Sequence, residues 1–154
     1  GSVSSMQTTY VMVKPDGVQR GLVGEIIGRF EAKGLQLVGL KGVVPSEEIA
    51  RSHYAVHSER PFFEGLIKFV TSGPVVCMAW SGVEAIKVAR GLIGPTNGRD
   101  AAPGTIRGDF GMDMGFNMIH GSDAEDTAAF ELNLWFPDGT MDWSCDSQKW
   151  VYES

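Results

Sequence analysis

The chain has 154 residues, of which 43% are hydrophobic, and its formal net charge is −6 at pH 7. This length and composition predict one domain with a substantial core and exclude a disordered chain. The acidic balance argues against nonspecific binding to nucleic acid or to anionic membranes, so we expect no membrane and no specific nucleic acid among the partners.

Cysteine usage and hydropathy both favour a protein of a reducing compartment. The two cysteines lie in an apolar run (Cys77) and in a polar tail (Cys145), which does not imply a structural disulfide. No window reaches the roughly 18 apolar residues of a membrane span, and no secretory signal opens the chain. We therefore expect a cytoplasmic protein. Gly1-Ser2 reads as an expression remnant, so residues 1–6 are expected to be a flexible N-terminus and residues 7–154 a single domain.

The first third of the chain predicts two strands around a helix. Residues 8–14 are β-branched, aromatic and apolar, which predicts a strand that ends on Lys14, before a Pro-Asp-Gly turn. Apolar residues recur at helical spacing over 22–33, and Gly34 then provides a C-cap. The alternation over residues 35–44 predicts the second strand.

A polar helix and turn are expected over residues 46–60, where His53 and His57 read as surface residues or as supports for a site. Beyond it the pattern predicts, in order, a helix over 63–70, a buried strand over 75–80 and a helix over 83–93.

Regular patterning stops over residues 94–115, a long stretch rich in glycine that is either disordered or functional. A short strand over 117–120 and a helix over 124–136 follow. The polar tail, 137–154, is expected to be anchored by three aromatic side chains, Trp143, Trp150 and Tyr152.

This order of elements favours an α/β fold of the α+β sandwich kind. We expect a ferredoxin-like, four-stranded antiparallel sheet with the split βαβ connection and with helices covering one face. A doubly wound parallel sheet is the alternative, less favoured because the chain has four strands and no glycine-rich first turn.

The segment Asn117-Met-Ile-His-Gly-Ser-Asp123 delivers a histidine, His120, from an apolar run to the start of a helix. Ser122 or Asp123 can cap that helix, and Glu125 would complete a capping box with Ser122. The positive end of the helix dipole disfavours imidazolium, which leaves a ring nitrogen free as a nucleophile, and it also attracts phosphate. A histidine at a strand end more often only hydrogen-bonds a neighbour, so this motif alone leaves catalysis open.

Phosphate binding would have to come from side chains, because the chain lacks both common glycine-rich nucleotide loops. The candidates lie near the ends of predicted elements: Lys14, Arg90, Thr96 and Arg107. Each by itself is more typical of a solvated residue. Phe62 is either a stacking platform for a base, which would tolerate any base, or part of the core. No histidines, cysteines and carboxylates show metal-ligand spacing.

Several segments, in the same order, resemble nucleoside diphosphate kinases from about residue 8 to the C-terminus. They are Lys14–Gly21 (KPDGVQRG), His53-Tyr54, Arg60–Phe63 (RPFF), Ser72–Val75 (SGPV), Pro103–Phe110 (PGTIRGDF) and Asn117–Asp123 (NMIHGSD).

The resemblance implies a phosphotransferase with a ping-pong mechanism. The γ-phosphoryl group of a nucleoside triphosphate, typically ATP, would pass to His120 and then to a nucleoside diphosphate, with broad base specificity. Mg²⁺ would arrive with the nucleotide phosphates, and no protein ligands for it are expected. The tail resembles that of family members that assemble as hexamers, which implies a homo-hexamer.

The resemblance also implies roles for individual residues. Lys14 and Tyr54 would assist the transferring phosphoryl group, and Glu131 and Ser122 would orient His120. The nucleotide would contact the remaining candidates, which are Arg90, Thr96 and Arg107 at the phosphates, Asn117 with Lys14 at the ribose, and Phe62 and Met114 at the base.

Four residues depart from the family pattern. Phe116 stands where the family usually has arginine, which removes a charge close to the nucleophile. Gly98-Arg99 replaces a proline and a small residue, which predicts a freer loop, and Met114 replaces a smaller aliphatic side chain. Phe116 motivates a second hypothesis, a binding or regulatory module with little turnover, although every residue matched to catalysis is present.

Overall fold

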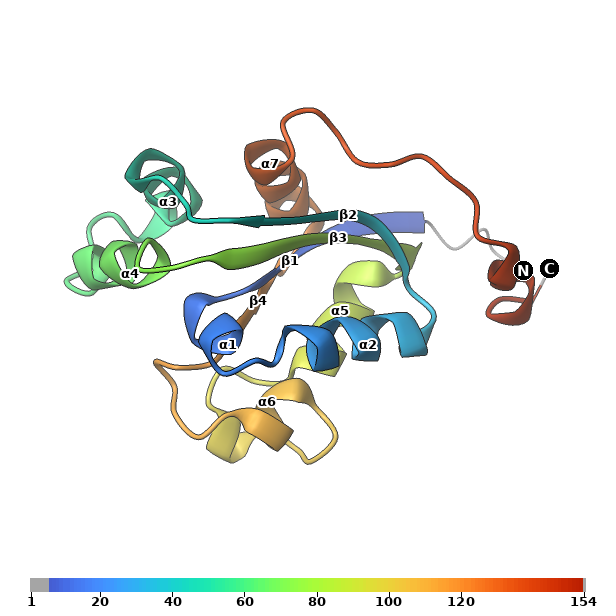
Figure 1. Cartoon of the computed structure of the whole chain (residues 1–154), viewed down its shortest axis with the longest axis horizontal. Coiled ribbons are helices and arrows are strands. Elements are labelled where there is room, and N and C mark those ends of the chain that lie inside the picture. The colour runs from blue at the N-terminus through green and yellow to red at the C-terminus, as the bar shows by residue number, and fades with distance from the viewer. Residues whose placement is uncertain (1–5, 154) are drawn as a thin grey trace.

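A four-stranded antiparallel sheet forms the middle layer of the molecule (Figure 1). In the computed structural model, which describes residues 6–153, the strand order is β2-β3-β1-β4. The strands are β1 (Met6–Val13), β2 (Gln36–Val43), β3 (Val75–Val83) and β4 (Ile119–Gly121). Because β3 pairs with both β1 and β2, it lies between two parallel strands that two helices connect. This arrangement confirms the ferredoxin-like sheet.

Helices cover both faces of the sheet, so the expectation that they cover one face was wrong. One face carries α2 (Val23–Lys33) and α5 (Ala85–Ile93), and the other carries α3 (Glu47–His53), α4 (Phe63–Val70) and α7 (Glu125–Trp135) (Figure 1). The physical reason is visible in β1, which is apolar on both sides and completely buried over its last four residues. Two cores result.

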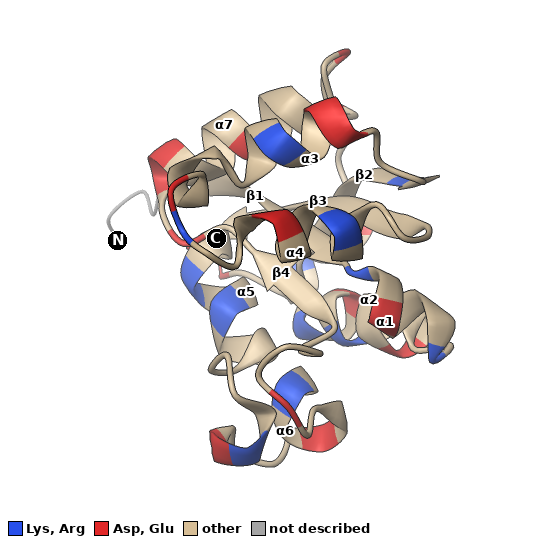
Figure 2. Cartoon of the chain, turned by 90° about the vertical axis from the view of Figure 1, so that its left-hand side faces the viewer, with Lys and Arg blue, Asp and Glu red and all other residues tan. Residues whose placement is uncertain are grey.

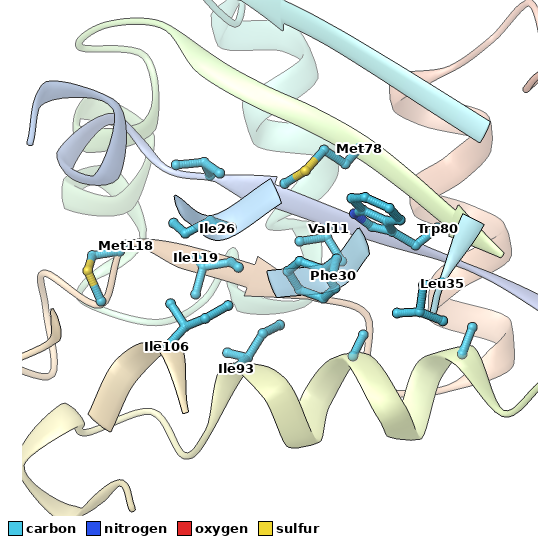
Figure 3. Close-up of a cluster of buried hydrophobic side chains, with 13 residues drawn as sticks. Val11, Ile26, Phe30, Leu35, Met78, Trp80, Ile93, Ile106, Met118 and Ile119 are labelled. Carbon is cyan, nitrogen blue, oxygen red and sulfur yellow. The ribbon is translucent and has the colours of Figure 1, made fainter. Parts of the chain in front are cut away.

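Alternate residues of β1 point into the two cores. Val11 and Val13 pack with Phe30, Trp80 and further side chains of α2 and α5 (Figure 3). On the other face, Tyr10 stacks on Trp135 of α7 with ring centroids 5.8 Å apart. The second core therefore links β1 directly to the helix that follows β4.

The N-terminal strand differs from its prediction at both ends. Residues 1–5 lie outside the described residues, but Met6 belongs to β1 and pairs with Val83. The strand ends at Val13, one residue before Lys14, and a five-residue helix, α1 (Pro15–Gln19), follows at once. Proline at the first helical position suits a helix start, although the Pro-Asp-Gly sequence also reads as a turn.

The long stretch before β4 is ordered around two short helices, η2 (Gly98–Asp100) and α6 (Ile106–Phe110). Gly98 is buried, and a Cβ at this position would lie 2.3 Å from the Gly111 carbonyl oxygen. A side chain at position 98 would therefore force one of these two backbone segments to move. The greater freedom expected of this loop from Gly98 stays a prediction.

The region after β4 also differs in detail from the sequence prediction. Helix α7 has Ala124 as its N-cap without a side-chain cap, so the capping box expected from Ser122 and Glu125 does not form. Two short 3₁₀ helices, η1 (Ala55–His57) and η3 (Asp146–Trp150), complete the elements. Within residues 6–153, no helix is long and apolar enough to cross a membrane.

Two of the three aromatic residues expected to anchor the tail do so. Trp143 Nε1–H donates to the Leu37 carbonyl oxygen at 3.0 Å, and the Tyr152 hydroxyl accepts from the Val83 N–H at 3.0 Å. Trp150 is 84% exposed, so its predicted anchoring role was wrong.

Candidate active site

A cavity of about 740 Å³ gathers most of the candidate residues at one end of β1 and β4. Its walls come from segments far apart in sequence: the ends of β1 and β4, helices α3, α5, α6 and α7, and the 3₁₀ turn η1. The predicted residues that line it are Lys14, Tyr54, Arg90, Thr96, Arg107, Asn117, His120 and Glu131. Ser122 is completely buried, in contact with Glu131, and Phe62 and Met114 are not part of the wall.

His120 lies in the middle of β4, paired with Met12 of β1, and its side chain is 24% exposed. Its Nε2 lies 2.9 Å from both carboxylate oxygens of Glu131, which is only 4% exposed. The Ser122 hydroxyl donates to the same carboxylate at 2.5 Å. A carboxylate only accepts hydrogen bonds, so this contact keeps the proton on Nε2 and the lone pair on Nδ1.

His53 packs behind the ring of His120, so it is not a surface residue. The two rings meet edge to face, with centroids 4.7 Å apart. Trp135 Nε1–H donates to His53 Nδ1 at 3.1 Å, which requires an unprotonated Nδ1. Burial, followed by the charges of His120 and Lys14, lowers the pKa of His53 to about 2. His53 therefore presents a neutral, fixed ring to the candidate nucleophile.

Three cationic side chains line the cavity: Lys14, Arg90 and Arg107. Lys14 Nζ donates to Asn117 Oδ1 at 3.0 Å, and Arg90 Nη1 donates to the Gly121 carbonyl oxygen at 3.2 Å. Burial, with a smaller contribution from Arg107, lowers the pKa of Lys14 to about 8. The basic segments on α5 and near α6 lie on one side of β4, and α7 carries acidic residues on the other (Figure 2). The cavity wall thus carries three cations together with three carboxylates, Asp123, Asp126 and Glu131, which lie on α7 or just before it.

Arg107 is almost completely buried, and its guanidinium is held by backbone. Its Nε, Nη1 and Nη2 atoms donate to the carbonyl oxygens of Asn117, Gly94 and Ile119. Burial, and next the charge of Arg90, lowers the pKa of Arg107 to about 10, so it keeps its charge at neutral pH. Arg107 therefore both supplies charge and braces the backbone that leads to His120.

Tyr54 contributes a neutral hydroxyl to the wall. Burial and the nearby charge of Glu131 raise its pKa to about 12, and its ring packs edge to face on His53. The phenol therefore keeps its proton and can donate it in a hydrogen bond.

The family model described as nucleoside diphosphate kinase matches residues 7–141. The chain belongs to the nucleoside diphosphate kinase family. A nucleoside diphosphate kinase of Synechococcus sp. (strain JA-3-3Ab) is 58% identical over 149 residues, which are 96% of this chain and 100% of that protein. The nucleoside diphosphate kinase of Picosynechococcus sp. is 59% identical over 149 residues, with the same coverage.

Solved structures of the family superpose over nearly the whole chain. The nucleoside diphosphate kinase of Halobacterium salinarum, in complex with CDP, has a TM-score of 0.93 and 53% identity, covering 97% of this chain and 100% of that chain. The family protein of Babesia bovis has a TM-score of 0.92 and 48% identity, covering 95% and 99%.

The departures from the family pattern leave the cavity charges in place. Phe116 is 60% exposed and packs edge to face on Phe69 of α4, with ring centroids 5.7 Å apart. It lies outside the cavity wall, and the three cations remain. Phe62 and Met114 are also about half exposed, so Phe62 is not a core residue.

Sequence reasoning missed two parts of this site. His57 lines the cavity, and its ring lies 5.6 Å from that of Phe62, so it connects the wall to the exposed ring. Helical spacing gave no signal for His57, because α3 ends at His53 and His57 lies in the separate turn η1. The second missed part is Asp16, which reaches the backbone just before β4.

Proposed function

We propose that the chain moves the γ-phosphoryl group of a nucleoside triphosphate, typically ATP, to a nucleoside diphosphate through a phosphohistidine at Nδ1 of His120. The observation that carries the proposal is the contact of Nε2 with both oxygens of Glu131. It leaves the lone pair on Nδ1, which has no hydrogen-bond partner among residues 6–153, in a ring that lines the cavity.

The transfer takes two displacements at phosphorus. Nδ1 attacks the γ-phosphorus, the bond to the bridging oxygen breaks, and the nucleoside diphosphate leaves with that electron pair. A terminal oxygen of the incoming diphosphate then attacks the same phosphorus, and the P–N bond breaks to restore neutral His120. Splitting the reaction lets one site serve both nucleotides. Positioning and charge supply most of the catalysis of phosphoryl transfer.

The proposal assigns the cavity residues to parts of the nucleotide. Lys14 and the neutral Tyr54 hydroxyl act at the transferring phosphoryl group, and Glu131 and Ser122 position His120. The contacts expected elsewhere are Arg90, Thr96 and Arg107 at the phosphates, Asn117 with Lys14 at the ribose, and Phe62 and Met114 at the base. Support comes from the shared cavity for all but Ser122, Phe62 and Met114. Stacking on an exposed ring predicts broad base specificity.

Mg²⁺ enters this proposal as part of the substrate. Among residues 6–153, the His, Cys, Asp and Glu side chains that gather in a group of three are His53, His120 and Glu131. Two imidazoles and one engaged carboxylate do not suit Mg²⁺, which prefers oxygen ligands and keeps its water. When bound with the nucleotide, the ion neutralises phosphate charge.

Assembly as a homo-hexamer in the cytoplasm completes the proposal. Exposed apolar side chains on the edge strand β2 and on the tail, such as Leu40 and Trp150, support burial against further subunits. Two free cysteines support a reducing compartment. Gel filtration with light scattering tests the assembly, and a stable monomer would contradict it.

The chemical proposal is tested with labelled ATP and Mg²⁺. We expect a phosphate on His120 that is labile in acid, stable in alkali, and chased onto any added nucleoside diphosphate. The stability in alkali separates it from a phosphate on the neighbouring Ser122. His120→Ala should abolish the label and keep the circular dichroism spectrum of the parent protein. If the parent protein forms no acid-labile phosphate, the proposal is wrong.

A further inference from the structure

The backbone reverses sharply two residues before His120. Met118 has φ +67°, in the region that side chains rarely adopt, and the Ile119 N–H donates to the Asn117 carbonyl oxygen at 2.8 Å. A hydrogen bond between residues two apart with a positive central φ defines a γ-turn of the rare, strained kind. Strain of this type costs about 1–3 kcal/mol and persists only where the surroundings enforce it.

The turn at Met118 sets the directions of the backbone before it, at Asn117, and after it, in β4. After it, β4 pairs with β1 and carries His120 opposite Met12. Before it, the Asn117 side chain lies against Lys14 Nζ at 3.0 Å. The strained residue Met118 therefore lies between His120 and Asn117, the residue that contacts Lys14. If the Met118 backbone relaxed, His120 would move relative to Asn117 and Lys14.

Hydrogen bonds from α1 and its cap hold both polar groups of the Met118 backbone. The Met118 N–H donates to Asp16 Oδ2 at 3.0 Å, and the Met118 carbonyl oxygen accepts from the Lys14 N–H at 2.7 Å. The Met118 side chain is completely buried beside Ile106 and Ile119 (Figure 3).

Gly17 allows α1 to come this close. A Cβ on Gly17 would lie 3.0 Å from the Met118 carbonyl oxygen and 2.7 Å from Val13 Cγ1. The short helix α1 thus places Gly17 against the turn, and the preceding residue, Asp16, supplies the carboxylate that binds it. Asp16 is the one side chain among those described that accepts from the Met118 N–H.

We propose that Asp16 is a positioning residue for the nucleophile: its carboxylate holds the strained γ-turn at Met118 and so sets His120 against Lys14. The proposal rests on the function proposed above. Asp16 acts through backbone and touches neither nucleotide nor phosphoryl group. Misplacement of a reacting group by about 1 Å can cost on the order of 100-fold in rate, so the loss of this one acceptor should be large in turnover.

Two variants and one control separate the role of Asp16 as a hydrogen-bond acceptor from the role of its charge. Asp16→Asn keeps an oxygen that can accept from Met118 N–H but removes the charge, and Asp16→Ala removes both. Asp109→Ala is the matched control, because the Asp109 carboxylate also accepts a backbone N–H, from Gly104 at 2.9 Å, away from the turn. Each is measured for single-turnover formation of the phosphohistidine at saturating ATP, for nucleotide affinity, and for melting temperature.

We expect Asp16→Ala to lose on the order of 100-fold in the rate of phosphohistidine formation. Asp16→Asn should lose less than about 10-fold, because a neutral hydrogen bond keeps about half the strength of a charge-assisted one. Rates are compared at the plateau of each pH profile, since loss of the Asp16 charge also lowers the pKa of Lys14. Asp109→Ala should keep the parent rate.

The outcomes distinguish the two proposals. If the parent protein forms no phosphohistidine, the proposed function fails. If the parent does and Asp16→Ala forms it at the parent rate, the function stands and the positioning role is wrong. Equal losses in Asp16→Asn and Asp16→Ala would also overturn it, because they would assign the effect to charge. If Asp16→Ala does not fold, a 10-fold or larger loss in folded Asp16→Asn contradicts the proposal, and a smaller loss supports it.

Discussion

Replacing Glu131 with glutamine tests how the protein chooses the reactive nitrogen of His120. The carboxylate accepts the Nε2–H and the Ser122 hydroxyl at the same time, so it excludes the tautomer with hydrogen on Nδ1. A glutamine side chain carries an NH₂ group that can donate to Nε2. The histidine can then shift its proton to Nδ1 and lose the lone pair that attacks phosphorus.

The size of the effect follows from burial. Glu131 is 4% exposed, so water cannot replace its contact with the ring. A hydrogen bond to a charged group contributes about 1.5–3 kcal/mol. If that contribution is lost in the transition state, where His120 gains positive charge, the rate falls roughly 10- to 150-fold. Nucleotide affinity should change little, since Glu131 is not assigned to the nucleotide.

Rapid-quench measurement of phosphohistidine formation at saturating ATP gives this rate directly. Glu125→Gln is the control, because Glu125 is an exposed glutamate in the first turn of the same helix. We expect the parent rate for Glu125→Gln and unchanged melting behaviour within a few degrees for both variants. A rate for Glu131→Gln within about threefold of the parent would refute the tautomer argument, since even the weakest charged hydrogen bond exceeds that loss.

Three further predictions concern charge and pH. The pKa of Lys14 lies near 8, so phosphohistidine formation in the free enzyme should fall above about pH 8 as Lys14 loses its proton, and a profile flat to pH 10 would exclude its charge from catalysis. The pKa of His53 is about 2 when folded and 6.5 as an unperturbed group, so the unfolded chain binds the extra proton and stability is lost as pH falls below 6.5. Urea unfolding should show a loss from this group of about 2 kcal/mol between pH 6.5 and pH 5, absent in His53→Gln; equal losses would contradict a neutral buried ring. Arg107→Ala should lower turnover roughly 100- to 1000-fold and also destabilise the fold, because three backbone carbonyl oxygens lose their donor; unchanged turnover would remove Arg107 from the phosphate contacts.

Local sequence patterns were sufficient to predict an element wherever one spacing of apolar residues dominates the segment. The helix over residues 63–70 and the buried run from Val75 were predicted with little error, because apolar spacing decides both. The errors lie where tertiary contacts override a local signal. Pro15-Asp16-Gly17 reads as a turn, but it forms α1 against Met118. Ser122 reads as a helix cap, whose oxygen would accept from a backbone N–H, but its hydroxyl instead donates to the charged carboxylate of Glu131.

The sequence by itself determined the family, the four-stranded fold and a set of polar residues, because motifs and apolar periodicity are properties of neighbouring positions. It predicted a strand that ends on His120, whereas His120 lies in the middle of β4. Only the tertiary structure decided which ring nitrogen is held, since that depends on a carboxylate eleven residues away, and how the strand is braced, since Asp16 lies 102 residues from Met118. Such contacts are long-range and follow from packing, which no local pattern encodes.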